Sequence, residues 1–231
     1  MKIKLMCDSL CDIPMELAEK HNIEIIPLTI IIEDKEYKDG VDMTEEEFYE
    51  TMKKIKTVPK TSQATYMQFK EAFDKYKDEY SIVCISGSSK SSGTYQSAVM
   101  AKNDTDGDIH IFDTLNLSLG SGRVSVTTAA IGNMLSLKPV FSVKDGNISL
   151  LTKVRGKKNV IHKLIDLLKE QYESFEDKNV MIGCGANKNE FEILKKEVQE
   201  AIKAKNIYLT RGGACICSHT GPDIIAISCS N

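Results

Sequence analysis

The sequence predicts an α/β protein in two parts: an N-terminal doubly wound domain with a parallel sheet, then a C-terminal α+β domain with an antiparallel sheet. In residues 1–113, short apolar runs alternate with amphipathic segments through short links, which is the pattern of βαβ units. After residue 139, an Asp-Gly pair between two β-like runs indicates a hairpin. A length of 231 residues suits one large domain or two small ones.

The N-terminal elements follow from apolar patterning and from helix-start signals. Pro14 fits the first turn of a helix, and Pro27 suits a strand edge or a bend. Thr44 and Glu47 have the spacing of a capping box, and Pro59 ends the helix that they begin. Strands are expected at 1–7, 23–32, 81–85 and 109–113, and helices at 13–22, 44–56, 66–79 and 94–102.

The C-terminal elements follow a different order. A short helix over 127–137 is expected to end before Pro139, and the Asp145-Gly146 turn joins the runs 140–143 and 148–154. Two amphipathic helices are predicted at 158–174 and 188–204. Further strands are expected at 179–184, 206–210, 214–217 and 224–229.

Composition excludes several classes of protein. The net charge of -3 excludes a generally basic nucleic-acid binder, and no apolar run reaches the roughly 18–20 residues of a membrane span. The first residues reach acidic side chains at once, unlike a signal peptide. Seven cysteines, an odd number, favour free thiols in the cytoplasm. Cys215, Cys217 and His219 alternate along a predicted strand, but zinc needs four ligands, so no metal is expected.

The Ser-rich segment 86–94 lies between a predicted strand and a predicted helix. Ligands of open α/β sheets bind beyond the carboxyl ends of strands, where helix amides favour an anion. Its hydroxyls therefore predict a cradle for a carboxylate or a phosphate, although a solvated N-cap loop explains the serines equally well. The segment lacks the Walker A pattern and the G-x-S-x-G elbow.

Three arginines stand out in a lysine-rich chain. Arg123, Arg155 and Arg211 offer planar forks that bind carboxylate or phosphate, but pairing with surface carboxylates is the plainer interpretation of each. His219 lies in a Gly-Pro turn segment, where it either titrates near neutral pH or serves structure alone.

Taken together, these clusters resemble the DegV family. The resemblance spans nearly the whole chain, and ten short motifs occur in the family's order. They are DSLCDIP (8–14), IPL (26–28), YKDGVD (37–42), PKTSQ (59–63), SSKSSGTYQS (88–97), DTLN (113–116), GRVS (122–125), KP (138–139), KVR (153–155) and HTGP (219–222).

The resemblance implies a function that the residues alone do not. It implies a long-chain fatty acid buried between two domains, 1–121 and 122–231, and no other cofactor. It also implies that the protein is the lipid-binding subunit of a fatty acid kinase, not itself an enzyme. A separate ATP-binding subunit would then phosphorylate the carboxyl group for phospholipid synthesis, in the cytoplasm and with transient membrane contact.

The resemblance also implies roles for individual residues. Thr61 and a serine of the 88–92 loop would hold the carboxylate, with Ser92 the first choice and Ser89 the second. Arg155 and His219 match positions near the carboxyl end of the lipid. Arg123 matches a family arginine that assists the kinase partner or the phosphoryl group.

One departure from the family is large. In the family, several dozen residues separate the segments that here are Leu119-Gly120-Ser121 and Gly122-Arg123. The absent part should include helices and a strand that bridge the two domains. Two other functions therefore stay open: an acyl hydrolase or transferase that uses the Ser loop and His219, and a degenerate member that binds another small anion.

Overall fold

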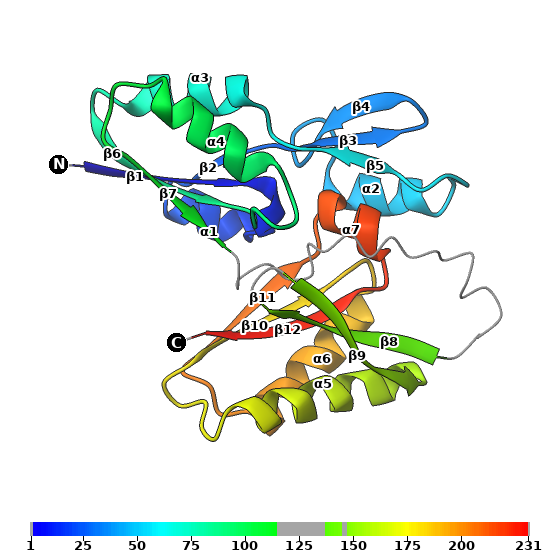
Figure 1. The fold of residues 1–231 in the computed structure, drawn as a ribbon. Helices are drawn as coiled ribbons and strands as arrows, with labels where there is room; N and C mark the ends of the chain where they lie inside the picture. The colour runs from blue at the N-terminus through cyan, green and yellow to red at the C-terminus, as the bar shows by residue number, and fades with distance from the viewer. Residues whose placement is uncertain (1, 115–136, 145–146, 231) are drawn as a thin grey trace.

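The N-terminal part of the chain contains the predicted parallel sheet. The computed structural model describes residues 2–114, 137–144 and 147–230. Strands β1 (Lys2–Asp8), β2 (Glu24–Ile26), β6 (Tyr80–Ser86) and β7 (Ile109–Asp113) form one sheet in the order β2-β1-β6-β7, with parallel neighbours throughout. Helices α3 (Tyr66–Tyr76) and α4 (Thr94–Asn103) lie on one side of it and α1 (Met15–Lys20) on the other (Figure 1). The doubly wound prediction is confirmed.

A second, small sheet of this part was not predicted. Strands β4 (Lys35–Lys38), β3 (Thr29–Ile32) and β5 (Lys60–Ser62) pair antiparallel in the order β4-β3-β5. The single strand expected at 23–32 is therefore wrong. Pro27, which has no amide to donate, separates β2 from β3, and the two strands join different sheets.

Helix α2 (Glu45–Met52) begins as the sequence predicts. Thr44 caps it by accepting from the Glu47 amide at 3.3 Å, and the Glu47 carboxylate accepts from the Thr44 amide at 2.8 Å. The helix buries Phe48 and Tyr49 toward β3, where Ile30 is fully buried.

The C-terminal part has its own sheet and its own core. Strands β10 (Asn179–Cys184), β11 (Asn206–Arg211) and β12 (Ile225–Ser230) have the order β11-β10-β12; the β10–β12 pair is antiparallel and the β10–β11 pair parallel. Helices α5 (Lys157–Gln171) and α6 (Lys188–Ala201) pack against it. The predicted hairpin is present as β8 (Leu137–Lys144) and β9 (Asn147–Arg155), which pair antiparallel. Most of the helix expected at 127–137 lies outside the described residues, and Leu137 begins β8.

The segment after β11 contradicts the sequence interpretation. A strand was expected at 214–217, but Ala214–Thr220 form helix α7, which begins after Gly213 and ends at Gly221. The five residues 214–218 are all buried, and an apolar run buried on every side has no amphipathic period that separates helix from strand.

Helix α7 belongs to the C-terminal part by sequence, yet it packs on the N-terminal part. It contacts α2, β3, β5 and the short 3-10 helix η1 (Ser9–Cys11). Figure 1 shows α7 beside α2. Its Ala214 and Cys217 lie in one apolar cluster with Ile30, Phe48 and Tyr49. In the part of the chain that is described, no helix combines the length and apolar character needed to cross a membrane.

Candidate functional site

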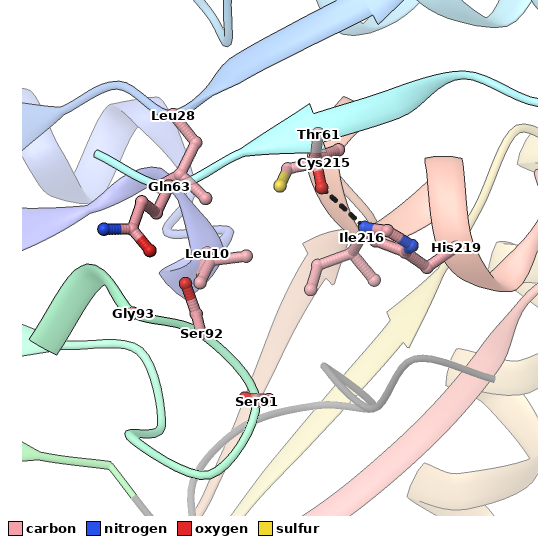
Figure 2. Close-up of a pocket in the computed structure, with 10 residues that line it drawn as sticks. All are labelled: Leu10, Leu28, Thr61, Gln63, Ser91, Ser92, Gly93, Cys215, Ile216 and His219. Atoms are coloured by element: carbon pink, nitrogen blue, oxygen red, sulfur yellow. Dashed lines mark hydrogen bonds between the residues drawn. The ribbon is translucent and has the colours of Figure 1, made fainter. Parts of the chain in front are cut away.

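A cavity lies where α7 meets the N-terminal part, and we call it the central cavity (Figure 2). Its volume is about 80 Å³, several times the space that one water molecule needs. Its walls come from η1, β5, the Ser-rich loop and α7. The lining residues are Leu10, Leu28, Thr61, Gln63, Ser91, Ser92, Gly93, Cys215, Ile216 and His219.

The position of the Ser-rich loop agrees with the rule for doubly wound sheets. The loop follows the carboxyl end of β6, and Leu10 follows the carboxyl end of β1. A buried carboxylate joins these two strand ends, because Asp8 accepts from the Gly87 amide at 2.7 Å and from the Ser86 hydroxyl at 2.9 Å. Burial raises the pKa of Asp8, although these hydrogen bonds oppose the rise. Asp8 thus fixes the first residues of the Ser-rich loop, Ser86 and Gly87.

Within the loop, Ser92 faces the central cavity and Ser89 does not. The Ser92 hydroxyl lies 2.8 Å from the Thr94 hydroxyl and accepts from the Thr94 amide at 3.2 Å, at the start of α4. Ser89 instead donates its backbone amide to Asp113 at 3.1 Å and does not line the cavity. The N-cap of α4 is Gly93, so Ser92 does not cap the helix; it binds the first helical residue from one position before the cap and presents a hydroxyl to the cavity.

Thr61 and His219 meet across the central cavity. The Thr61 Oγ1 lies 2.6 Å from His219 Nε2, although the two residues are 158 positions apart in the sequence (Figure 2). The direction of this hydrogen bond decides what Thr61 offers a ligand. When Nε2 carries the proton and donates, the single hydroxyl proton of Thr61 stays available for an anion. When Nε2 is unprotonated, it accepts that proton itself.

Gln63 also lines the cavity and was not among the candidate carboxylate-binding residues. Its Nε2 donates to the Ser97 hydroxyl at 3.0 Å. A Cβ atom on Gly93 would lie only 2.0 Å from Gln63 Oε1, so this approach requires glycine. Gln63 closes the PKTSQ motif, and that motif was the available signal for it.

Cys215 and Ile216 were missed for a different reason. The expected strand put Cys215, Cys217 and His219 on one face, but the helix separates Cys217 from the other two. Residues 215 and 219 are one turn apart, so both reach the cavity, whereas Cys217 points into the apolar cluster around Phe48. Among the described residues, no group of three His, Cys, Asp or Glu side chains could hold a metal ion.

The three arginines occupy different places. Arg123 lies outside the described residues. Arg155, at the end of β9, is exposed and does not line the central cavity. Arg211 pairs with Glu46 and lies 3.7 Å from Glu45, so for this arginine the pairing interpretation applies.

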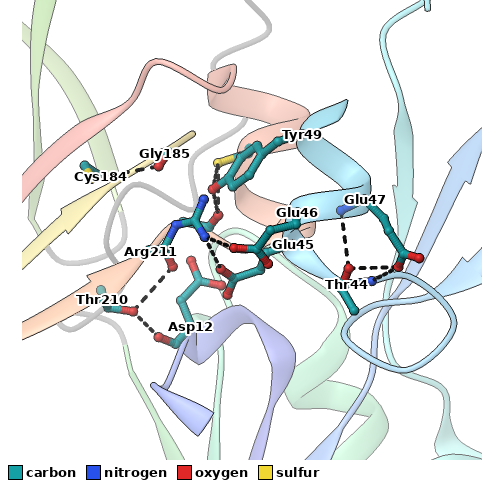
Figure 3. A network of polar contacts seen from close by, with 12 residues as sticks. Asp12, Thr44, Glu45, Glu46, Glu47, Tyr49, Cys184, Gly185, Thr210 and Arg211 are labelled. Carbon is teal, nitrogen blue, oxygen red and sulfur yellow. Dashed lines mark hydrogen bonds and ion pairs between the residues drawn. The ribbon is translucent and has the colours of Figure 1, made fainter. Parts of the chain in front are cut away.

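Arg211 is part of a polar network that joins the two parts of the chain (Figure 3). Its guanidinium lies 5.0 Å from the centre of the Tyr49 ring, and the Tyr49 hydroxyl donates to the Gly212 carbonyl. Burial raises the pKa of the Tyr49 phenol, so the group stays neutral and acts as a donor. The Thr210 hydroxyl donates to the Asp12 carbonyl beside it. These contacts fix the end of β11, from which α7 starts.

Comparison with known proteins matches the chain to a sequence family. The sequence model of the DegV family, described as "Uncharacterised protein, DegV family", matches in two pieces, residues 2–122 and 120–231. The two pieces meet at the junction where the sequence lacks several dozen residues of the family pattern.

Alignments with individual relatives are longer than this chain. A DegV domain-containing protein of Caldanaerobacter subterraneus is 31% identical over an alignment of 279 residues, which covers 98% of each protein, although this chain has 231. A fatty acid-binding protein of Thermotoga maritima is 28% identical, with 97% of this chain and 96% of the relative covered. The crystal structure of a DegV lipid binding protein from the same organism superposes with a TM-score of 0.87 at 26% identity, covering 100% and 98%.

Proposed function

Because this chain belongs to the DegV family, we propose that it binds a long-chain fatty acid between its two parts and presents the carboxylate to a separate ATP-dependent kinase subunit. The observation that carries the proposal is the central cavity, in which Thr61, Ser92 and His219 lie together. The names of the relatives, a fatty acid-binding protein and a lipid binding protein, support the class of ligand.

The chemistry of the cavity suits an amphipathic anion. A carboxylate that leaves water needs several hydrogen-bond donors, because an unpaired buried charge is costly. Thr61 in β5, Gln63 just after it and Ser92 in the Ser-rich loop supply donors, and Thr61 lies 2.6 Å from His219. Leu10, Leu28 and Ile216 supply apolar surface for the adjacent methylene groups, each worth about 0.8 kcal/mol when buried.

The proposed role of His219 is to set the direction of the Thr61 hydrogen bond. With the proton on Nε2, His219 donates to Thr61, and Thr61 donates to the lipid carboxylate. In the transfer step, a carboxylate oxygen attacks the γ-phosphorus of ATP held by the partner subunit, the bond to ADP breaks, and an acyl phosphate forms. We assign Arg155 and Arg123 to partner docking or to the phosphoryl group, and the boundary between domains to residues 121/122.

Lipid extraction and titration test the proposal. Protein expressed in bacteria should carry a fatty acid that native mass spectrometry and extraction detect. Thr61→Val should weaken palmitate binding about tenfold, the value of one good hydrogen bond to a charged group, without loss of melting temperature. The matched control is Thr152→Val on β9, away from the cavity, which should leave palmitate affinity unchanged. A chain that neither carries nor binds fatty acid would refute lipid binding.

The partner step needs its own test. Purified parent protein loaded with palmitate should yield acyl phosphate with ATP only when an ATP-binding kinase subunit is added. The product can be trapped as the hydroxamate. Acyl phosphate formed without the second subunit would refute the role of a presenting carrier.

One observation favours a second function. The Thr61 hydroxyl lies within hydrogen-bond reach of an imidazole, which is also the geometry of a nucleophile and its base. An acyl hydrolase would turn over p-nitrophenyl palmitate and lose that activity in Thr61→Val or His219→Gln, and a hydrolase that uses the Ser loop would lose it in Ser92→Ala. If the protein binds palmitate tightly but does not hydrolyse p-nitrophenyl palmitate, the hydrolase function is excluded and the carrier function remains.

A further inference from the structure

The helix that carries His219 has an unusual N-terminus. Helix α7 has only seven residues, and its N-cap, Gly213, has no side chain to accept from the first amides. Such a short helix is not stable by itself, and its first amides need partners. The partners come from the other part of the chain.

Two carboxylates of the N-terminal part take these amides. The Gly213 amide donates to Asp12, which follows η1, and the Cys215 amide donates to Asp39, which follows β4. A Cβ atom on residue 213 would lie 2.3 Å from Asp12 Oδ1, so the close approach of this carboxylate requires glycine. Negative charge at a helix N-terminus also suits the helix dipole.

Asp39 is itself held in place. Its backbone amide donates to the Leu28 carbonyl at 2.9 Å, and its carboxylate accepts from the Ser9 hydroxyl. The Ser9 hydroxyl in turn accepts from the Leu28 amide at 3.0 Å. Asp39 is only 7% exposed, and its Oδ2 has no hydrogen-bond partner. A buried carboxylate with one oxygen unpartnered is costly, so its place at the start of α7 calls for a role.

We propose that Asp39 and Asp12 are positioning residues for His219, because they fix the N-terminus of α7 from the opposite part of the chain. His219 is two turns from Gly213, and its ring must reach Thr61 to form the 2.6 Å contact. Loss of either cap frees the first turn of α7 and moves His219 away from Thr61. The expected effect on lipid affinity rests on the proposed function. The inference that the two carboxylates position His219 is independent of that function.

The test measures His219 directly. The chain has four histidines, so NMR spectra of the lipid-free protein with labelled histidine should show four ring signals. The signal that is missing in His219→Gln belongs to His219. In Asp39→Ala and in Asp12→Ala, the His219 signal should move toward that of a water-exposed histidine. Palmitate should bind about fivefold to tenfold more weakly in both variants.

Two further variants complete the design. Asp39→Asn keeps one acceptor oxygen and should restore most of the His219 signal and of the palmitate affinity. Asp34→Asn, an exposed change of the same charge in the β3–β4 turn, should change neither. Should an alanine variant fail to fold, the asparagine variant at that position replaces it, with a smaller change expected in the same direction.

The outcomes separate this proposal from the proposed function. An unchanged His219 signal in folded Asp39→Ala and Asp12→Ala overturns the positioning role, whatever the lipid does. A parent protein that binds no palmitate but whose His219 signal moves in both variants refutes lipid binding and supports the positioning role.

Discussion

Replacing Asp39 with asparagine should change the pH dependence of stability. Burial raises the pKa of this carboxyl from 3.8 to about 6, although Ser9 and the Cys215 amide oppose the rise. Between these two pH values the folded protein holds a proton that the unfolded chain has released. The folded state then binds more protons, so the Asp39 contribution to the free energy of unfolding falls as pH rises from about 4 to about 6.

The size of the effect follows from the same values. At 1.36 kcal/mol for each pH unit, the step from 3.8 to about 6 amounts to about 3 kcal/mol. Asparagine resembles the protonated acid and does not titrate. Its amide nitrogen, placed where Oδ2 now has no partner, adds a cost that is the same at every pH. Part of this change is already complete at pH 4, where the unfolded carboxyl is more than half ionised, so the variant should gain about 2 kcal/mol relative to the parent between pH 4 and pH 7.

Urea unfolding of both proteins at pH 4, 5, 6 and 7 measures this gain. Asp12 and Glu45 remain in the variant, but the pKa of each is raised by burial and in part by the charge of Asp39. The difference between the two proteins therefore reports Asp39 together with its effect on these two carboxyl groups. Asp34→Asn should follow the parent at every pH. A difference between Asp39→Asn and the parent that stays constant from pH 4 to pH 7 would refute the reasoning.

Three further predictions concern packing, capping and the cavity wall. Phe48→Ala should lower the free energy of unfolding by about 3–5 kcal/mol in urea, because its ring is fully buried between α2 and α7; a loss below 1 kcal/mol would contradict that packing. Thr44→Ala should lower the free energy of unfolding by about 1 kcal/mol in the same assay, since it removes the capping box of α2. The control is Thr152→Ala, the same substitution at a threonine that caps no helix. Gly93→Ala should displace Gln63 and weaken palmitate binding severalfold in a titration, with little change in melting temperature; unchanged affinity would remove Gln63 from the site.

Local signals were sufficient for much of the fold. Period-two and helical patterns place β1, β6, β7, α3 and α5 within a few residues, and the Thr44–Glu47 capping box is observed as predicted. The small sheet was missed because β4 and β5 have three or four residues, mostly polar and exposed, with no alternation to detect. Their pairing depends on β3, which is distant in sequence from β5.

The candidate site was predictable only in pieces. Thr61, Ser92 and His219 were each named from motifs and do line one cavity. Their meeting depends on α7, which the sequence presents as an apolar run of uncertain type, so neither the Thr61–His219 contact nor the caps from Asp12 and Asp39 could be anticipated. Contacts between residues more than 150 positions apart leave no local pattern.

The distant origin of α7 has a consequence for how the protein is made. As the ribosome synthesises the chain, the N-terminal part emerges first, but the apolar side of Phe48, Ile30 and Tyr49 stays uncovered until α7 has been added. A chain that stalls before α7 therefore exposes an apolar, aggregation-prone surface that α7 covers in the folded protein. The same delay means that the central cavity lacks the wall formed by Cys215, Ile216 and His219 until α7 has been synthesised.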